Sequence, residues 1–298
     1  MPSNQQRINP FRAIYDSNAY KLARISKQAK APFIVDVELT NNCNLMCNMC
    51  ARKLMTRERG FMERDVFVRV LDECIKTGTP IRFIRWGEPF LHRKITEWAR
   101  KAKEAGLLVH ITNNGLIITE TQMHDIVNMG LDSIIFSMQG ATKKGYEKMR
   151  NNNQYDKLYA NILKLIEIRG DNKAPHIHVS STMTDETEEE IEIFKNYWSN
   201  IVDSVDVGKT SFARLSGGDG NYVPCNEVYQ KLSIDWDGKV TACCGDYDNL
   251  LTVGDIKKES LVEIFNGEKL KSIRTILDNT GHKNLALCSK CYRAYEDF

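Results

Sequence analysis

The stretch "PFIVDVELTNNCNLMCNMC" (residues 32–50) joins an apolar run to three closely spaced cysteines. The run at 32–39 is rich in apolar and β-branched residues, which predicts a buried strand. Cys43, Cys47 and Cys50 follow with the spacing C-x3-C-x2-C, and no fourth cysteine lies close by. The cysteines are therefore expected at the C-terminal end of a strand, where parallel α/β sheets and barrels place their functional sites.

Zinc, a disulfide pair and an iron–sulfur cluster are the alternatives that these cysteines leave open. Structural zinc takes a fourth Cys or His ligand, and the next histidine, His92, lies beyond a second predicted strand. A four-iron cluster held by three cysteines keeps one iron open for another ligand. The missing fourth cysteine is then the position at which a small molecule binds.

The alternation of strands and helices continues from residue 32 to about residue 209. Predicted strands are 32–39, 81–86, 107–112, 132–137, 176–182 and 202–207, and predicted helices are 63–77, 93–105, 119–128, 142–169 and 185–200. Such units predict a parallel sheet with right-handed connections. They fit an open doubly wound sheet or a partial barrel, and no G-x-G-x-x-G motif follows the first strand.

Composition excludes several classes of protein. The 298 residues carry 41 basic and 39 acidic side chains, so we expect neither a nucleic-acid partner nor a membrane partner. No apolar run has the length of a membrane span and the start has no signal peptide, which predicts a cytoplasmic location. Nine cysteines in such a chain favour metal ligation over disulfides. Cys74 is spaced like a helical core residue and is expected to be a buried thiol.

Three further segments follow the cysteines in an order that resembles the radical S-adenosylmethionine (SAM) superfamily. "RWGEP" (85–89) resembles the G-G-E-P motif of that family, with Trp86 in place of the first glycine. "ITNNG" (111–115) resembles its third-strand turn, and "FSMQGATKKGYEKMR" (136–150) resembles its fourth-strand segment. The resemblance implies an α/β fold, a partial (β/α)6 TIM-type barrel.

The same resemblance implies the cofactors. Cys43, Cys47 and Cys50 would hold a [4Fe-4S] cluster that binds SAM. The SAM molecule itself would be bound by residues of the second, third and fourth strands, namely Trp86, Gly87, Glu88, Pro89, Asn113, Ser137 and Arg150. A reductant such as flavodoxin or ferredoxin would supply the electron that cleaves SAM to methionine and a 5′-deoxyadenosyl radical. That radical would abstract hydrogen from a substrate.

A second cysteine group lies in the C-terminal part. A β-hairpin is predicted over 229–244 with its turn at Asp237-Gly238, followed by a helix at 260–278. Together with the hairpin, four cysteines resemble the SPASM/Twitch extension of the same superfamily, a small α+β domain. Cys225, Cys243, Cys288 and Cys291 would then ligate one auxiliary [4Fe-4S] cluster, and structural zinc is the alternative. The predicted organisation is a lead-in (1–31), the barrel (32–213) and the auxiliary domain (214–298).

Cys244 is left over after these assignments. It is a ligand in place of Cys243, an inert neighbour, or a hydrogen-atom donor to a substrate radical. Two other candidate catalytic residues are Glu38, which ends the first strand beside the cysteines, and His178, which shares one strand face with His176. The lead-in of residues 1–31 is shorter than the leader-peptide-binding domain that peptide-modifying relatives often carry.

The predicted function is therefore that of an oxidoreductase or epimerase. It would oxidise or invert an alcohol carbon of a small polar molecule, such as a sugar or an aminocyclitol. One alternative is a maturase of a ribosomally made peptide. The alternative from another class is a non-enzymatic iron–sulfur or zinc scaffold protein.

Overall fold

A computed structural model describes residues 7–139, 142–183, 187–209 and 221–291. Its first six strands are parallel neighbours in chain order, as the alternating units predict. They are β1 (Ile34–Val37), β2 (Ile81–Phe83), β3 (Val109–Asn113), β4 (Ser133–Ser137), β5 (His176–Met183) and β6 (Ser204–Lys209). A doubly wound sheet reverses its strand order at one point, whereas this order runs in a single direction. The fold is therefore the partial barrel.

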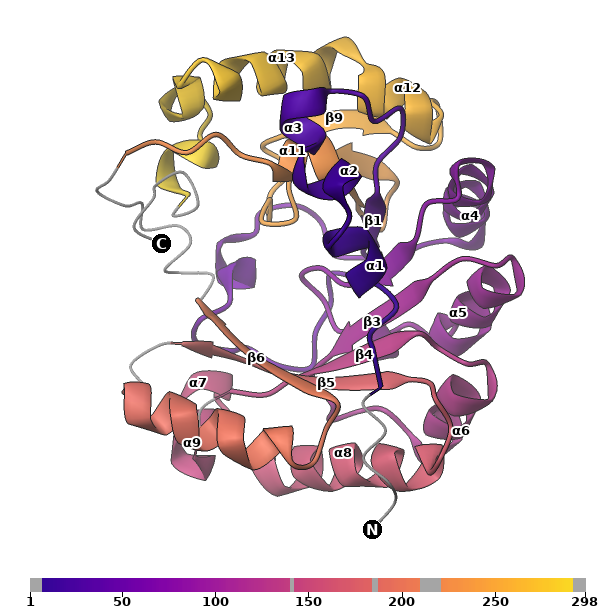
Figure 1. The fold of residues 1–298 in the computed structure, drawn as a ribbon, viewed down its shortest axis with the longest axis vertical. Helices are drawn as coiled ribbons and strands as arrows, with labels where there is room; N and C mark the ends of the chain where they lie inside the picture. Colours follow the sequence, from indigo (N-terminus) through magenta and orange to yellow (C-terminus); the bar gives the residue numbers. More distant parts are fainter. Residues whose placement is uncertain (1–6, 140–141, 184–186, 210–220, 292–298) are drawn as a thin grey trace.

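Helices form an outer layer around this sheet (Figure 1). They are α4 (Arg64–Thr77), α5 (Ile95–Glu104), α6 (Glu120–Asn128), α7 (Lys143–Arg150), α8 (Tyr155–Arg169) and α9 (Glu188–Ser199), with short 3-10 turns η1 (Ala51–Leu54) and η2 (Pro89–Leu91). The predicted helix at 142–169 is divided in two because Asn151 adopts the left-handed conformation, with φ 54°, and ends α7. At α9 the side chain of Thr187 accepts from the backbone N–H of Glu190, which forms a capping box.

The two faces of the sheet differ in polarity. Residues that face the helices are apolar and fully buried, as Ile111, Ile134 and Val179 illustrate. Most residues at the alternate positions are polar, and several pair across neighbouring strands: Asp36 with Arg82, His110 with Ser133, and His178 with Ser204. The inner face of the partial barrel is therefore lined largely by polar side chains.

The C-terminal elements extend the same sheet beyond β1. Strand β7 (Lys231–Ile234) pairs parallel with β1, and β8 (Lys239–Thr241) and β9 (Thr252–Asp255) follow antiparallel. The predicted hairpin turn is confirmed, since Gly238 adopts φ +91°, but β9 was not predicted. The accompanying helices are α11 (Glu227–Gln230), α12 (Leu261–Asn266) and α13 (Glu268–Asp278), with 3-10 turns η3 (Gly281–Asn284) and η4 (Cys288–Lys290). The predicted helix at 260–278 thus breaks at Gly267, and the predicted domain boundary at 213/214 falls outside the described residues.

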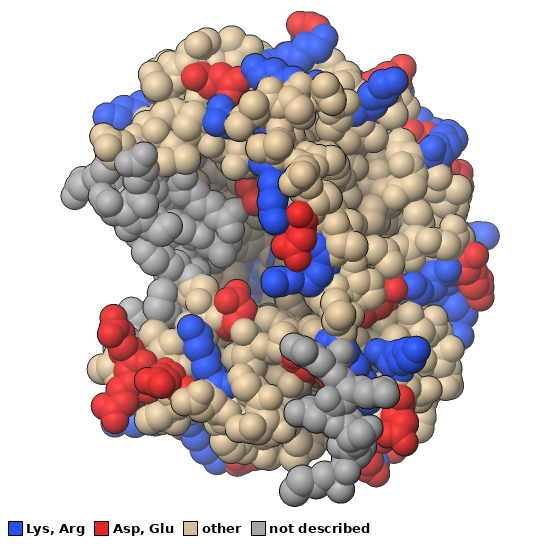
Figure 2. Space-filling view, viewed as in Figure 1, with Lys and Arg blue, Asp and Glu red and all other residues tan. Residues whose placement is uncertain are grey.

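The N-terminal lead-in packs against the barrel and the C-terminal elements. Its helices are the single turns α1 (Arg12–Tyr15), α2 (Asn18–Lys21) and α3 (Ala23–Ser26). Phe11 and Tyr20 form a small buried cluster with Ile34 of β1, and the Tyr20 carbonyl accepts from Gln230 Nε2 at 2.8 Å. Basic and acidic side chains intermingle on the face seen in Figure 2. Within the described ranges, no helix has the length and apolar character of a membrane span.

Candidate active site

The loop with Cys43, Cys47 and Cys50 starts directly beyond β1. The buried Arg52 braces it by donating from Nη2 to the Leu45 carbonyl at 2.5 Å. Two thiols also have side-chain donors: Asn114 Nδ2 lies 3.9 Å from Cys43 Sγ, and Arg150 Nη1 lies 3.5 Å from Cys47 Sγ. The end of β3 and the end of α7 therefore meet the cysteine loop, as the order of the motifs predicts.

The turn after β2 packs directly against the same loop. A Cβ on Gly87 would lie 1.9 Å from the Thr40 carbonyl oxygen, so only glycine allows this approach of the two backbones. The next residue, Glu88, donates its N–H to the Asn42 carbonyl at 2.8 Å. Its carboxylate accepts from the Asn114 N–H at 2.7 Å, and burial raises the pKa of Glu88 to about 7. Glu88 thus joins the ends of β1 and β3.

The remaining predicted SAM contacts lie nearby, and several already have protein partners. Arg150 donates from Nη2 to the Ser137 carbonyl at the end of β4. Asn113 donates to the Ile135 carbonyl at 2.9 Å and accepts from the Gly115 N–H at 2.7 Å, so its side chain shapes the turn. Pro89 begins η2. The indole Nε1 of Trp86 donates to the Asp246 carbonyl at 3.0 Å, in the C-terminal part, and the cofactor contact of Trp86 stays a prediction.

The residues around the first cysteine loop fit an anionic iron–sulfur group. Soft thiol donors are the ligands that such clusters take. Two buried guanidinium nitrogens beside the loop, Arg52 Nη1 and Arg150 Nε, have no hydrogen-bond partner in the protein, and unpartnered buried donors are costly unless a further acceptor is bound. No three Cys, His, Asp or Glu side chains among the described residues are arranged for a single metal ion. In a cubane each thiolate binds a different iron.

The second cysteine group draws together residues that are far apart in the chain. Burial is the main cause that raises the pKa of Cys288 to about 12, and the charges of Cys225 and Cys291 add to it. The charge of Cys291 likewise contributes to the raised pKa of Cys225. Cys243, on the loop after β8, is affected by the charge of Cys225, and its Sγ accepts from the Gly245 N–H at 3.3 Å. Four thiols therefore gather near the start of β7 and the end of β8.

Cys244 adjoins Cys243 but has different surroundings. A hydrogen bond with Cys243 lowers the pKa of Cys244 to about 7, while the charges of Glu227 and Asp36 oppose this shift. The charge of Cys244 also acts on Arg82, which lies on the inner face of the barrel. The thiol of Cys244 is thus close to the polar inner face of β1 and β2.

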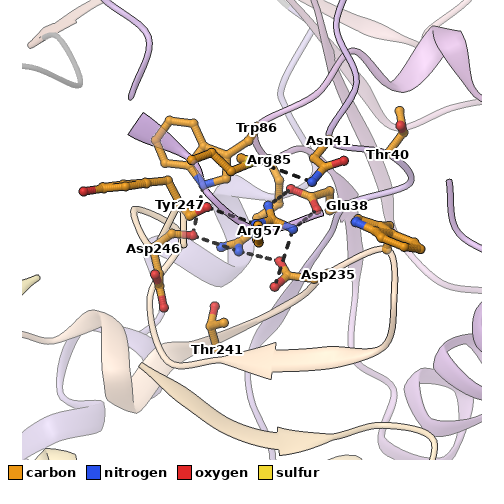
Figure 3. A network of polar contacts seen from close by, with 12 residues as sticks. Glu38, Thr40, Asn41, Arg57, Arg85, Trp86, Asp235, Thr241, Asp246 and Tyr247 are labelled. Atoms are coloured by element: carbon orange, nitrogen blue, oxygen red, sulfur yellow. Dashed lines mark hydrogen bonds and ion pairs between the residues drawn. The ribbon is translucent and has the colours of Figure 1, made fainter. Parts of the chain in front are cut away.

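A buried network of charged groups joins the residues that follow β1 and β2 to the residue that follows β7 (Figure 3). Both carboxylate oxygens of Glu38 accept from Arg57, at 2.6 Å each. Asp235, which follows β7, lies 3.8 Å from Arg57 and 2.6 Å from Arg85. Burial raises the pKa of Asp235 to about 6. Glu38, a predicted catalytic residue, therefore anchors Arg57.

His178 lies where the strand alternation predicts it, on the inner face of β5. Its Nδ1 lies 2.7 Å from Ser204 Oγ on β6. Burial lowers the pKa of His178 to about 4, so the imidazole is neutral at pH 7. A neutral imidazole held through one nitrogen can accept a hydrogen bond from a hydroxyl group, and its lowered pKa makes it a weak base.

Sequence reasoning missed three residues of this region: Arg57, Asp235 and Asp246. No motif surrounds Arg57, which follows the cysteine loop. Asp235 did carry a signal, because it is an acidic residue within the predicted hairpin, shortly before its turn at Asp237-Gly238. Asp246 is fully buried and accepts the Leu251 N–H at 2.8 Å, which shapes the loop after Cys244.

Comparison with known proteins defines the class. The model of the radical SAM superfamily matches residues 37–215, and that of an iron–sulfur cluster-binding domain, SPASM, matches residues 225–292. The chain therefore belongs to the radical SAM superfamily. It is an enzyme that uses SAM, a [4Fe-4S] cluster and auxiliary cluster chemistry in its C-terminal domain.

Curated relatives match over a limited segment. A tungsten-containing aldehyde ferredoxin oxidoreductase cofactor-modifying protein of Pyrococcus furiosus is 33% identical over 104 residues, which are 34% of this chain and 29% of that protein. A PqqA peptide cyclase of Ruegeria pomeroyi is 30% identical over 113 residues, 38% of this chain and 30% of the relative. The matches thus span about a third of the length of these relatives.

Solved structures match over nearly the whole chain. The structure of BtrN in complex with AdoMet and 2-DOIA has a TM-score of 0.61 at 17% identity, covering 90% of this chain and 97% of BtrN. Streptococcus suis SuiB bound to precursor peptide SuiA has a TM-score of 0.71 at 14% identity, covering 99% of this chain and 82% of SuiB. At these identities the likeness establishes the shared fold.

Proposed function

We propose that this radical SAM enzyme inverts an alcohol carbon of a small polar molecule, such as a sugar or an aminocyclitol. The observation that carries the proposal is the position of Cys244. Its thiol is close enough to Asp36 and Arg82, on the inner face of the barrel, to interact with their charges, and it adjoins Cys243 of the auxiliary cysteine group. A thiol at that place is suited to return a hydrogen atom to a substrate held in the barrel.

The proposed ligand sets use the other cysteines of the two groups. Cys43, Cys47 and Cys50 hold the SAM-binding cluster, with Glu88, Ser137 and Arg150 beside it for the cofactor. The set Cys225, Cys243, Cys288 and Cys291 saturates one auxiliary cluster. Mutual electrostatic effects among Cys225, Cys288 and Cys291 support this set.

Each step of the proposed reaction can then be assigned to the bound cofactors or to residues of the chain. When bound, the first cluster and SAM supply a 5′-deoxyadenosyl radical that removes a hydrogen atom from the substrate carbon. Cys244 gives its S–H hydrogen atom to the opposite face of that carbon. One electron and one proton, supplied with the external reductant, restore the resulting thiyl to a thiol. The polar inner face orients the substrate hydroxyl groups by hydrogen bonds and keeps the reacting carbon near the thiol.

Anaerobic reconstitution followed by assays on sugars and aminocyclitols tests the proposal. In D2O the S–H of Cys244 exchanges, so the inverted product should carry one deuterium at the inverted carbon. Cys244→Ala should lose the inverted product and still form 5′-deoxyadenosine. Cys74→Ala is the matched control, because Cys74 is a fully buried core thiol on α4. Inversion that survives Cys244→Ala would remove Cys244 from the mechanism.

Oxidation to a ketone is the competing outcome of the same assay. The neutral His178, held by Ser204 on the inner face, supports it as a hydrogen-bond acceptor for the hydroxyl group of the alcohol. A ketone without deuterium incorporation would identify the enzyme as a dehydrogenase. In that case His178→Gln should reduce ketone formation while 5′-deoxyadenosine continues to form.

Peptide maturation is the second candidate function. It is supported by the names of the relatives, which include PqqA peptide cyclases and the SuiB structure with a bound precursor peptide. A short peptide encoded beside the gene, incubated with the reconstituted enzyme, would change in mass if it is the substrate. An unchanged peptide mass under conditions that produce 5′-deoxyadenosine would reject that peptide as the substrate.

A further inference from the structure

Arg85 connects the turn after β2 to the loop of the second cysteine group. Its side chain is 1% exposed. Nη1 donates to the Cys243 carbonyl at 3.0 Å, and Nη2 donates to the Asp246 carbonyl at 3.0 Å. Nη2 also contacts Asp235 Oδ1 at 2.6 Å. One guanidinium thus binds two carbonyls of the loop and a carboxylate at the end of β7.

Trp86 adds a second attachment to the same loop. Its indole Nε1 donates to the Asp246 carbonyl at 3.0 Å, which Arg85 also contacts. Its ring meets Tyr247 edge to face, with centroids 6.1 Å apart and planes at 88° (Figure 3). Two consecutive side chains therefore hold one carbonyl and one ring of the loop that follows Cys243.

The next two residues of the turn face the other cysteine group. Gly87 packs on the Thr40 carbonyl, and Glu88 bonds Asn42 and Asn114. Residues 85–88 are thus a rigid connection between the two loops, attached to one by Arg85 and Trp86 and to the other by Gly87 and Glu88. Because the attachments come from consecutive residues, a displacement of one loop is transmitted to the other over a short stretch of chain.

The charge of Arg85 also bears on the auxiliary cluster. A reduced [4Fe-4S] cluster carries one more negative charge than the oxidised cluster, so a nearby cation stabilises the reduced form. Hydrogen bonds and charges around the ligands of a metal site are known means of setting its potential. Arg85 touches the backbone of Cys243, and its Nε has no hydrogen-bond partner in the protein.

We propose that Arg85 and Trp86 are positioning residues that hold the auxiliary-cluster loop in register with the SAM site, and that the Arg85 guanidinium raises the reduction potential of the auxiliary cluster. The inference rests on the proposed assignment of Cys243 as a ligand. It does not depend on the substrate or on inversion.

An EPR-monitored redox titration of the reconstituted full chain tests the inference. The first cluster is recognised by the change of its spectrum on addition of SAM, and iron content is measured in parallel. Arg85→Gln should shift the potential of the auxiliary cluster to a lower value while the SAM-induced change persists. Arg85→Lys, which keeps the charge but not the planar fork, should give a smaller shift. Trp86→Phe keeps the ring and loses the N–H, and should broaden the auxiliary signal without lowering iron content.

Arg169→Gln is the matched control. Arg169 is also buried, pairs with Asp203 and donates to the Pro175 carbonyl at 3.0 Å, beside β5. It should leave both potentials unchanged. Selective loss of the auxiliary iron in Arg85→Gln would also support the inference, since the first cluster would then be intact without the second.

Two results would overturn the inference. One is an unchanged auxiliary potential in Arg85→Gln at full iron content. The other is an equal loss of both clusters in Arg85→Gln and Arg85→Lys, which would assign Arg85 to general stability. Neither measurement requires turnover, so a failure of the proposed inversion reaction would not affect the inference. An unchanged auxiliary potential would likewise not affect the proposed inversion reaction.

Discussion

The two cysteine groups are assembled in opposite ways. The first lies within one loop, and its three cysteines span residues 43–50 directly after β1. The second spans residues 225–291 and is brought together only when β7 pairs with β1 and η4 turns back toward the loop after β8. The first group is therefore a local structure that the barrel supports. The second depends on the whole C-terminal part being in place.

This difference has a functional meaning. A local loop at the end of β1 forms as soon as the neighbouring turns pack on it. A site assembled from distant residues requires contacts between the two parts, and the network of Glu38, Arg57, Asp235 and Arg85 provides them. Removing elements of either group should therefore give separable defects.

The largest separable effect is expected from single cysteine substitutions. Cys47→Ala should abolish SAM cleavage, because two cysteines no longer hold the cluster to which the cofactor binds. Cys288→Ala should leave 5′-deoxyadenosine formation measurable and lower the iron content by the amount of one cluster. Anaerobic reconstitution with iron analysis and chromatography of the products checks both. Equal loss of SAM cleavage in the two variants would contradict the separation of the groups.

The difference also explains how much the sequence could predict. Strand β1 and the first cysteine loop follow from local patterns, namely an apolar run and the C-x3-C-x2-C spacing. The inner position of His178 follows from strand alternation. The pairing of Glu38 with Arg57 does not, because the two residues are separated by the cysteine loop and meet only through tertiary packing. The end of α7 was missed because a left-handed Asn151 interrupts an otherwise helical pattern.

The network between the groups should carry a large share of the stability of their contact. Arg57→Met would leave the buried carboxylates of Glu38 and Asp235 without one of their cations, and breaking a buried pair in this way costs about 3–5 kcal/mol. Chemical denaturation should show this loss in the free energy of unfolding.

A surface pair serves as the control for the network. Lys94 and Glu97 form an exposed ion pair at 2.8 Å. Lys94→Ala should change the free energy of unfolding far less than Arg57→Met does, because exposed ion pairs contribute little to stability. A loss in Arg57→Met no larger than that of Lys94→Ala would mean that the network does not stabilise the contact between the two parts.

The smallest expected effect concerns the barrel alone, away from both cysteine groups. Burial lowers the pKa of His178 to about 4 from the 6.5 of an unperturbed histidine. Between pH 4 and pH 6.5, His178 is therefore protonated in the unfolded chain and neutral in the folded chain. The unfolded state binds more protons in this window, so stability rises with pH and is lost as pH falls from 6.5 toward 4. The loss amounts to roughly 2–3 kcal/mol.

Replacing the imidazole by a neutral amide should remove this contribution. His178→Gln should flatten the pH dependence of the free energy of unfolding between pH 6.5 and 4, measured by denaturation at several pH values. His124→Gln, at an exposed position on α6, is the control and should retain the wild-type slope. Since His178 contacts Ser204 on the far side of the barrel from β7, the change should leave the iron content of both clusters intact. A loss of either cluster in His178→Gln would show that the barrel wall and the cysteine groups are coupled more closely than their contacts indicate.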